Sequence, residues 1–152
     1  MAVFAALLGA MSLDVAAIQD DYPYLDCANA GSTIEQNICA GREVRVLEDT
    51  LAHYTNTAYA LIREHSDANA ELLISEIKES EQLWKAYADA ACGAVYTQWS
   101  SGTIRNVMAA SCHMELIRER THHIWREYLV TMEGLAKLPE PERTEYDFGV
   151  ED

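Results

Sequence analysis

The 152-residue sequence is poor in the residues that interrupt helices. It holds only seven glycines and three prolines, and no proline lies between residues 24 and 138. Alanine, leucine, glutamate and arginine are common instead, which is the composition of helices. No internal repeat is present, and a chain of this length suits one domain. We therefore expect a single all-α domain.

Positive charge is also scarce. Eleven Lys and Arg residues stand against 25 Asp and Glu residues, so the formal net charge is -14. A surface this acidic repels phosphate backbones and anionic lipid head groups, which disfavours nucleic acid and membrane surfaces as partners. The natural electrostatic complement is a basic protein partner.

The common signatures of enzymes are missing as well. The sequence has no G-x-S-x-G motif, no phosphate-binding loop and no C-x-x-C pair. Glu115, Glu119 and His122 share one predicted helix face, but the second Glu-x-x-His of bundle-type di-iron proteins is absent. We therefore predict no catalytic residue, no cofactor and no metal site, with a metal-binding helical enzyme as a lesser alternative.

The first residues have the pattern of a secretory signal. Residues 1–11 carry no charge, and Val15-Ala16-Ala17 supplies a small-x-small cleavage site. The apolar run is too short for a permanent membrane anchor. No Lys or Arg precedes Arg42, so the positive n-region is missing, and a buried N-terminal helix is the alternative. We expect residues 1–17 to act as a signal and the protein to be periplasmic or secreted.

Apolar residues at steps of three and four predict three long helices. The first begins at Ser32-Thr33-Ile34-Glu35, a capping box with Ser32 as N-cap and Glu35 reaching back, and Gly41 favours a kink or break in it. Its apolar stripe comprises Ile34, Ile38, Val44, Leu47, Leu51, Tyr54, Ala58 and Leu61. The second stripe comprises Leu73, Ile77, Trp84, Tyr87, Ala91 and Val95.

The third helix is predicted from about Ile104 to Met132, after a connection at Trp99–Thr103 that contains Gly102. Its stripe comprises Ile117, Thr121, Ile124, Tyr128 and Met132. We expect a small antiparallel bundle of three long helices within residues 18–133. From Gly134 onward, proline and acidic residues predict a solvated, flexible tail over residues 134–152.

Four cysteines in a small exported chain indicate two disulfides, and three pairings are open. If the second and third helices are antiparallel about Gly102, residues at equal distances from Gly102 along the chain lie opposite each other. Cys92 and Cys112 are such a pair, because each is ten residues from Gly102. Such a position allows the Cα separation that a disulfide needs. Cys27 and Cys39 remain, and their bond would fasten the entering segment to the first helix. We favour this sequential pairing.

The motifs around these cysteines resemble the LprI-type lysozyme inhibitor family. Asp26-Cys27-x-x-Ala30, Ser32 and Glu35-x-Asn37-x-Cys39-Ala40 resemble the opening of the family pattern. Trp84-x-x-Tyr87-x-Asp89-Ala90-x-Cys92, Gly102-Thr103-Ile104, Cys112-x-x-x-Leu116 and Arg120 follow in order. The likeness covers about Asp26 to Leu129 and implies an exported all-helical bacterial domain, with lysozyme inhibition for some members.

The chain also departs from the family pattern. Ala88 stands where the family usually has Arg. Ser32 and Ile117 each stand where Thr is usual, and Glu81 occupies the usual Gln position, with Gln82 one place late. We expect structural roles for the motif residues Asp26, Glu35, Trp84, Tyr87, Asp89 and Arg120. Trp84 and Tyr87 are predicted in the core, and Asp89 is predicted to accept a hydrogen bond from a helix terminus or from the backbone of the Cys27 segment.

The connection between the second and third helices is the predicted partner contact. It holds Tyr96, Trp99, Ser100, Ser101 and Thr103, and loops on rigid scaffolds often carry recognition through Trp and Tyr. A cap that closes the end of the bundle is the alternative for this segment. We therefore predict an inhibitor that binds lysozyme, a basic protein, or else a binding or immunity-type module for another exported partner.

Overall fold

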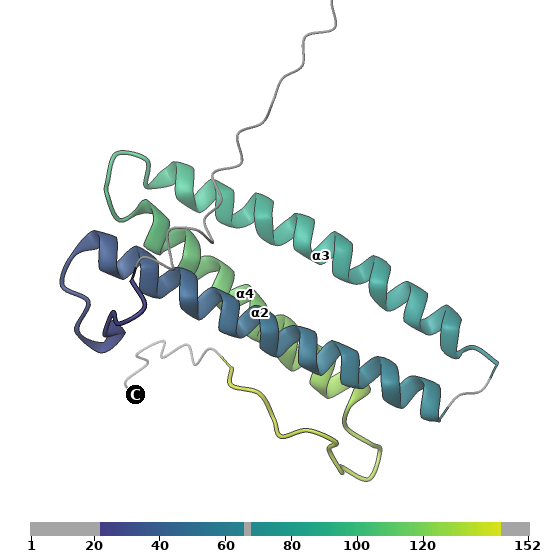
Figure 1. The fold of residues 1–152 in the computed structure, drawn as a ribbon. Coiled ribbons are helices and arrows are strands. Elements are labelled where there is room, and N and C mark those ends of the chain that lie inside the picture. The colour runs from purple at the N-terminus through teal and green to yellow at the C-terminus, as the bar shows by residue number, and fades with distance from the viewer. Residues whose placement is uncertain (1–21, 66–67, 144–152) are drawn as a thin grey trace, which may run out of the picture.

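Three long helices form the molecule, as the computed structural model shows for residues 22–65 and 68–143 (Figure 1). They are α2 (Thr33–Glu64), α3 (Ala70–Gln98) and α4 (Arg105–Tyr128), and a short 3-10 helix, η1 (Cys27–Asn29), precedes them. No β-strand is assigned within these residues. The predicted all-α bundle is confirmed, whereas the predicted signal at residues 1–17 lies outside the described residues.

The start of α2 is fixed by the predicted capping box. The Ser32 hydroxyl accepts from the Glu35 backbone N–H at 3.2 Å, and Glu35 Oε2 accepts from the backbone N–H groups of Ser32 and Gly31 at 2.8 and 2.9 Å. These hydrogen bonds lower the pKa of the Glu35 carboxyl, and the bond from the Ser32 backbone N–H has the largest effect. Past this start α2 runs without a break through Gly41, so the break expected there is wrong.

The core lies where α4 packs along both other helices. Its buried members come from all three helices and from the residue after α4: Leu51, Tyr54, Ala58, Ile77, Ile117, Ile124 and Leu129. Most helix–helix contacts join α4 to α2 or to α3, while α2 and α3 touch each other only sparsely. The side chains between α2 and α3 are therefore only partly covered.

Both disulfides have the predicted pairing. Cys27 is bonded to Cys39 and Cys92 to Cys112, with a Cα separation of 5.5 Å in each pair. The first bond fastens η1 to α2, and the second joins α3 to α4 beside the turn at Gly102. The antiparallel hairpin inferred from the cysteine positions is therefore confirmed.

Several residues of the predicted apolar stripes face solvent. Tyr87 is 61% exposed, and Ile34 and Met132 are also exposed, so their predicted core positions are wrong. The third helix ends at Tyr128 rather than Met132. There the chain turns through Gly134, whose φ of 76° suits glycine, and Val130 pairs with Ala136 in an isolated bridge.

Residues 134–143 differ from the expected flexible tail. The Tyr54 hydroxyl donates to the Pro139 carbonyl and the Trp125 indole N–H to the Leu138 carbonyl, both at 2.9 Å. His122 Nε2 lies 3.1 Å from Glu140 Oε1. These contacts hold the segment against α2 and α4, and the rest of the predicted tail, residues 144–152, lies outside the described residues.

Candidate protein-binding groove

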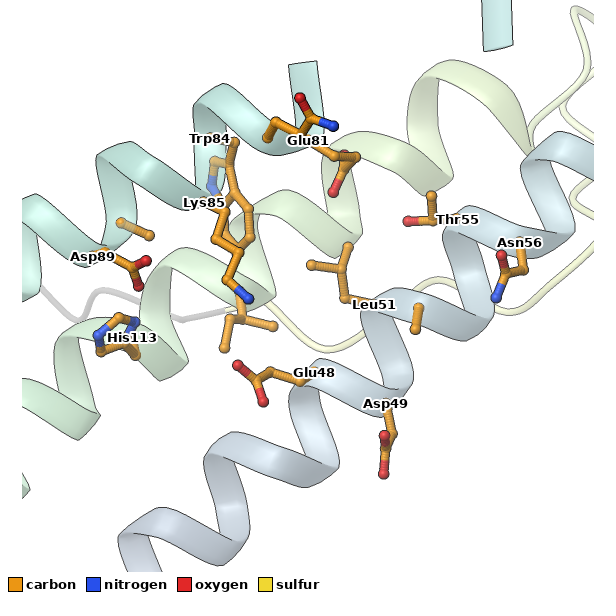
Figure 2. A pocket seen from close by; sticks show the side chains of 14 residues that line it. Glu48, Asp49, Leu51, Thr55, Asn56, Glu81, Trp84, Lys85, Asp89 and His113 are labelled. Carbon is orange, nitrogen blue, oxygen red and sulfur yellow. The ribbon is translucent and has the colours of Figure 1, made fainter. Parts of the chain in front are cut away.

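A groove of about 580 Å³ lies between α2 and α3, with α4 beneath it (Figure 2). It exists because α2 and α3 each pack on α4 and leave the space between themselves open. The apolar part of its lining includes Leu51, Ala88, Ile117 and the Trp84 indole. The polar part includes Glu48, Asp49, Thr55, Asn56, Glu81, Gln82, Lys85, Asp89 and His113.

Negative charge dominates this groove. Within the described residues, the carboxylates of Glu48, Asp49 and Asp89 make no ion pair or hydrogen bond. Glu81 is different, because Arg120 Nε donates to its Oε1 at 2.8 Å. Lys85 and His113 are the basic residues of the lining. The α2–α3 groove therefore combines an apolar base with three carboxylates that are available to a cation.

One hydroxyl in the groove has no partner. Thr55 is only 7% exposed, and its Oγ1 makes no hydrogen bond with any described residue. Figure 2 shows this side chain on α2, with the oxygen turned toward the space between α2 and α3. A buried polar atom left unsatisfied costs about 1–3 kcal/mol. A ligand group in the groove would supply the missing hydrogen bond.

The motif residues of the sequence divide between the groove and the ends of helices. Asp26 caps η1, since its carboxylate accepts from the Ala28 backbone N–H at 3.0 Å and from Asn29 Nδ2 at 2.6 Å. These two hydrogen bonds lower the pKa of Asp26, and the bond from Asn29 has the larger effect. Arg120 also donates to Ser80 Oγ at 2.8 Å, and so it holds Glu81 in place from α4.

Trp84 and Asp89 lie at the groove. Trp84 is half-buried and packs against the core, as predicted. Asp89 is exposed on the groove wall, and within the described residues it lacks the predicted hydrogen bond to a helix terminus or to the Cys27 segment. Its carboxylate is therefore free to meet a partner.

The predicted contact loop forms the end of the bundle at which α3 and α4 are joined. Trp99 is 41% exposed, and Ser100, Ser101 and Thr103 are also exposed. The Arg105 guanidinium lies 5.1 Å from the centre of the Tyr96 ring and stiffens the start of the loop. Tyr96 follows Asp89 by seven residues, or two helical turns, so both lie on the same face of α3. Tyr96 and the groove residue Asp89 thus share one side of α3.

The residues weighed as metal ligands, Glu115, Glu119 and His122, all lie on α4. Within residues 22–65 and 68–143, no group of three or more His, Cys, Asp or Glu side chains is placed to hold a metal ion. His122 instead contacts Glu140 of the C-terminal segment. Its neighbour His123 has a pKa lowered by burial and, to a lesser degree, by the positive charge of Arg120.

Sequence patterns did not identify Glu48, Asp49, Thr55, Lys85 or His113 as groove residues. These side chains come from three helices and belong to no motif, so only the packing of α2 and α3 on α4 brings them together. One usable signal is Thr55, a polar residue between the stripe residues Tyr54 and Ala58. Another is the family pattern, because its departures at Glu81, Ala88 and Ile117 all line the groove.

Comparisons with known proteins give one family and one distant relative. A family model described as lysozyme inhibitor LprI matches residues 26–123. An uncharacterized protein of Rhizobium meliloti (strain 1021) is 27% identical over 109 residues, which cover 65% of this chain and 76% of that protein. No solved structure matches the chain. No helix in the described part is both long and apolar enough to cross a membrane.

Proposed function

The chain belongs to the LprI lysozyme inhibitor family, and we propose on this basis that it is an exported protein that inhibits lysozyme by binding to it directly. Its role is to bind a protein, and no catalytic step is assigned to it. The family match supports the inhibitory activity. The partner is then a basic protein, as the net charge of -14 favours.

The family match carries this proposal, and the set of unpaired carboxylates at the α2–α3 groove supports it. Glu48, Asp49 and Asp89 attract a cationic surface without first breaking an ion pair within the described residues. Complementary charge raises the rate of encounter and disfavours partners of the same sign. An apolar base beneath the carboxylates adds contact area that water leaves on binding.

We assign the contact surface to the groove together with the Trp99 loop. Seven residues of helix separate Asp89 from Tyr96, which is about 10 Å. A specific interface covers about 800 Å² on each partner, enough to include both regions. Trp99, Ser100, Ser101 and Thr103 would then contact lysozyme at one end of the interface, and the groove would contact it at the centre.

Export is supported by the two disulfides and by the signal-like residues 1–17. Disulfides persist in the periplasm and outside the cell, where the environment is oxidising. All four cysteines of the chain are bonded. The protein would therefore meet lysozyme in the periplasm or outside the cell.

A turbidity assay tests this function. Lysozyme clears a suspension of bacterial cell walls, and the oxidised protein is expected to slow the clearing in proportion to its concentration. The same chain, reduced and alkylated with iodoacetamide, is the matched control, since it keeps the acidic charge but lacks both disulfides. Clearing at an unchanged rate with the oxidised protein would instead favour a binding or immunity-type module for another exported partner.

A further inference from the structure

Thr55 behaves unlike the other threonines that lie beyond the first turn of these helices. The hydroxyls of Thr50, Thr57, Thr97 and Thr121 each donate to the backbone carbonyl four residues earlier, at 2.8–3.1 Å. That bond satisfies a helical threonine without help from outside. Thr55 does not make it, although its hydroxyl is buried at the groove and excluded from water. The side chain is placed to bond with something that enters the α2–α3 groove.

Lys85 also lies in the groove without a close partner among the described residues. Figure 2 shows its side chain extending from α3 across the groove toward Glu48, and Trp84 lies beside it. Among the described residues its ammonium forms no ion pair. A cation therefore already stands among the three carboxylates, but no close contact holds it there.

The remaining features of the groove suit a cation from outside. The Trp84 indole offers an aromatic face, on which a basic side chain is stabilised. Asp89 lines the groove from α3 and Glu48 lines it from α2, and Thr55 Oγ1 is an additional acceptor that is buried in the groove wall. A guanidinium or ammonium group donates several hydrogen bonds at once, so it can satisfy a carboxylate and a hydroxyl together.

We propose that the α2–α3 groove binds a basic side chain of the protein partner, and that Lys85 is an internal competitor that this side chain displaces. The proposal rests on the proposed function only in naming lysozyme as the partner. Charge complementarity, the apolar base and the unpartnered Thr55 hydroxyl specify the occupant.

Two pairs of variants on α3 test the charges of the groove against lysozyme. We expect Asp89→Asn to weaken binding about tenfold, and Lys85→Met to strengthen it about threefold. Glu79→Gln and Lys78→Met make the same charge changes on the same helix outside the groove, and are expected to alter affinity far less. If each control matches its groove variant, net charge alone governs binding and the groove assignment is wrong.

Thr55→Val separates binding from folding. Replacing the unpartnered hydroxyl by a methyl group should leave the melting temperature unchanged or raise it, because a buried unsatisfied group is removed. The same variant should bind lysozyme about threefold more weakly, since an acceptor for the basic side chain is lost. Unchanged affinity would show that no partner group reaches Thr55 and would contradict the proposal.

A peptide titration tests the groove even if lysozyme is not the partner. We expect acetyl-Gly-Arg-Gly-amide to shift the indole NMR signal of Trp84 in a saturable way, and the uncharged citrulline peptide to leave it in place. Trp125, whose indole donates to the Leu138 carbonyl, supplies an internal reference signal. Binding to lysozyme without any Trp84 shift by the arginine peptide would overturn the groove assignment and leave the proposed function intact.

Discussion

Trp99 is the residue through which the contact loop is tested most simply. It follows the last residue of α3, is 41% exposed, and its indole N–H has no hydrogen-bond partner among the described residues. An aromatic side chain that caps a bundle would be covered by its neighbours. A half-exposed indole with a free donor is better suited to a partner, because aromatic anchors dominate the energetics of many interfaces.

Trp99→Ala should therefore reduce lysozyme affinity by about 2 kcal/mol or more if the residue is a hot spot. The helical circular dichroism signal and the melting temperature should stay close to those of the wild type. Titration calorimetry and thermal unfolding measure the two quantities. A variant that melts much lower and keeps its affinity would identify Trp99 as a cap of the bundle.

Local chemistry determines which single residues can be predicted from the sequence. The Ser32–Glu35 capping box was predictable because both partners lie within one turn. Tyr87 was misplaced because periodicity cannot tell which side of a long helix a neighbour covers, and α3 contacts mainly α4. Thr55 was missed for the same reason, since its burial depends on helices that are distant in the sequence.

At the scale of elements, α3 depends strongly on its link to α4. It makes few contacts with α2, so the Cys92–Cys112 bond and the packing on α4 hold it in place. One wall of the α2–α3 groove is a face of α3. The stability of this single helix thus decides whether the groove keeps its shape.

The double variant Cys92→Ser/Cys112→Ser should lose about 3 kcal/mol of unfolding free energy, as expected for opening a loop of this length. Amide exchange along the C-terminal half of α3 should also increase. Chemical denaturation and hydrogen exchange measure these effects. Cys27→Ser/Cys39→Ser is the matched comparison, with faster exchange confined to η1 and the start of α2. Unchanged exchange in α3 after loss of the 92–112 bond would contradict its role in holding the groove.

Helix limits were largely predictable, but the chain after α4 was not. Apolar spacing located α2 and α3 to within a few residues, and the cysteine positions gave the hairpin of α3 and α4. The composition of residues 134–143 is acidic and rich in proline, which predicts a flexible tail. The segment is ordered instead because Tyr54 and Trp125 donate to its carbonyls, and these donors are far away in the sequence.

For the whole molecule, the acidic surface couples stability to pH. Hydrogen bonds lower the pKa of Asp26 and of Glu35 below their ordinary values of 3.8 and 4.5. The unfolded chain therefore binds protons at a pH where the folded chain does not. The resulting stability is complete above the ordinary values and is lost as the pH falls through the lowered values of the folded state.

Glu35→Gln isolates one of these groups, because glutamine retains a hydrogen-bonding oxygen without the charge. The variant should melt below the wild type at pH 6, and the difference should shrink as the pH falls from about 5 to 3. Thermal unfolding of both proteins across this range measures it. Comparing the two chains removes the effect of the other acidic groups. A difference that stays constant with pH would show that the charge of Glu35 does not stabilise the cap.

Titration of the oxidised protein with lysozyme, followed by calorimetry at low and at molar salt, tests the central claim most directly. We predict saturable binding at low salt that weakens strongly at 1 M, where the Debye length falls to about 3 Å. Such a result would support recognition of a basic partner through the acidic surface of this protein. An absence of saturable binding at low salt, or an affinity that salt leaves unchanged, would contradict it.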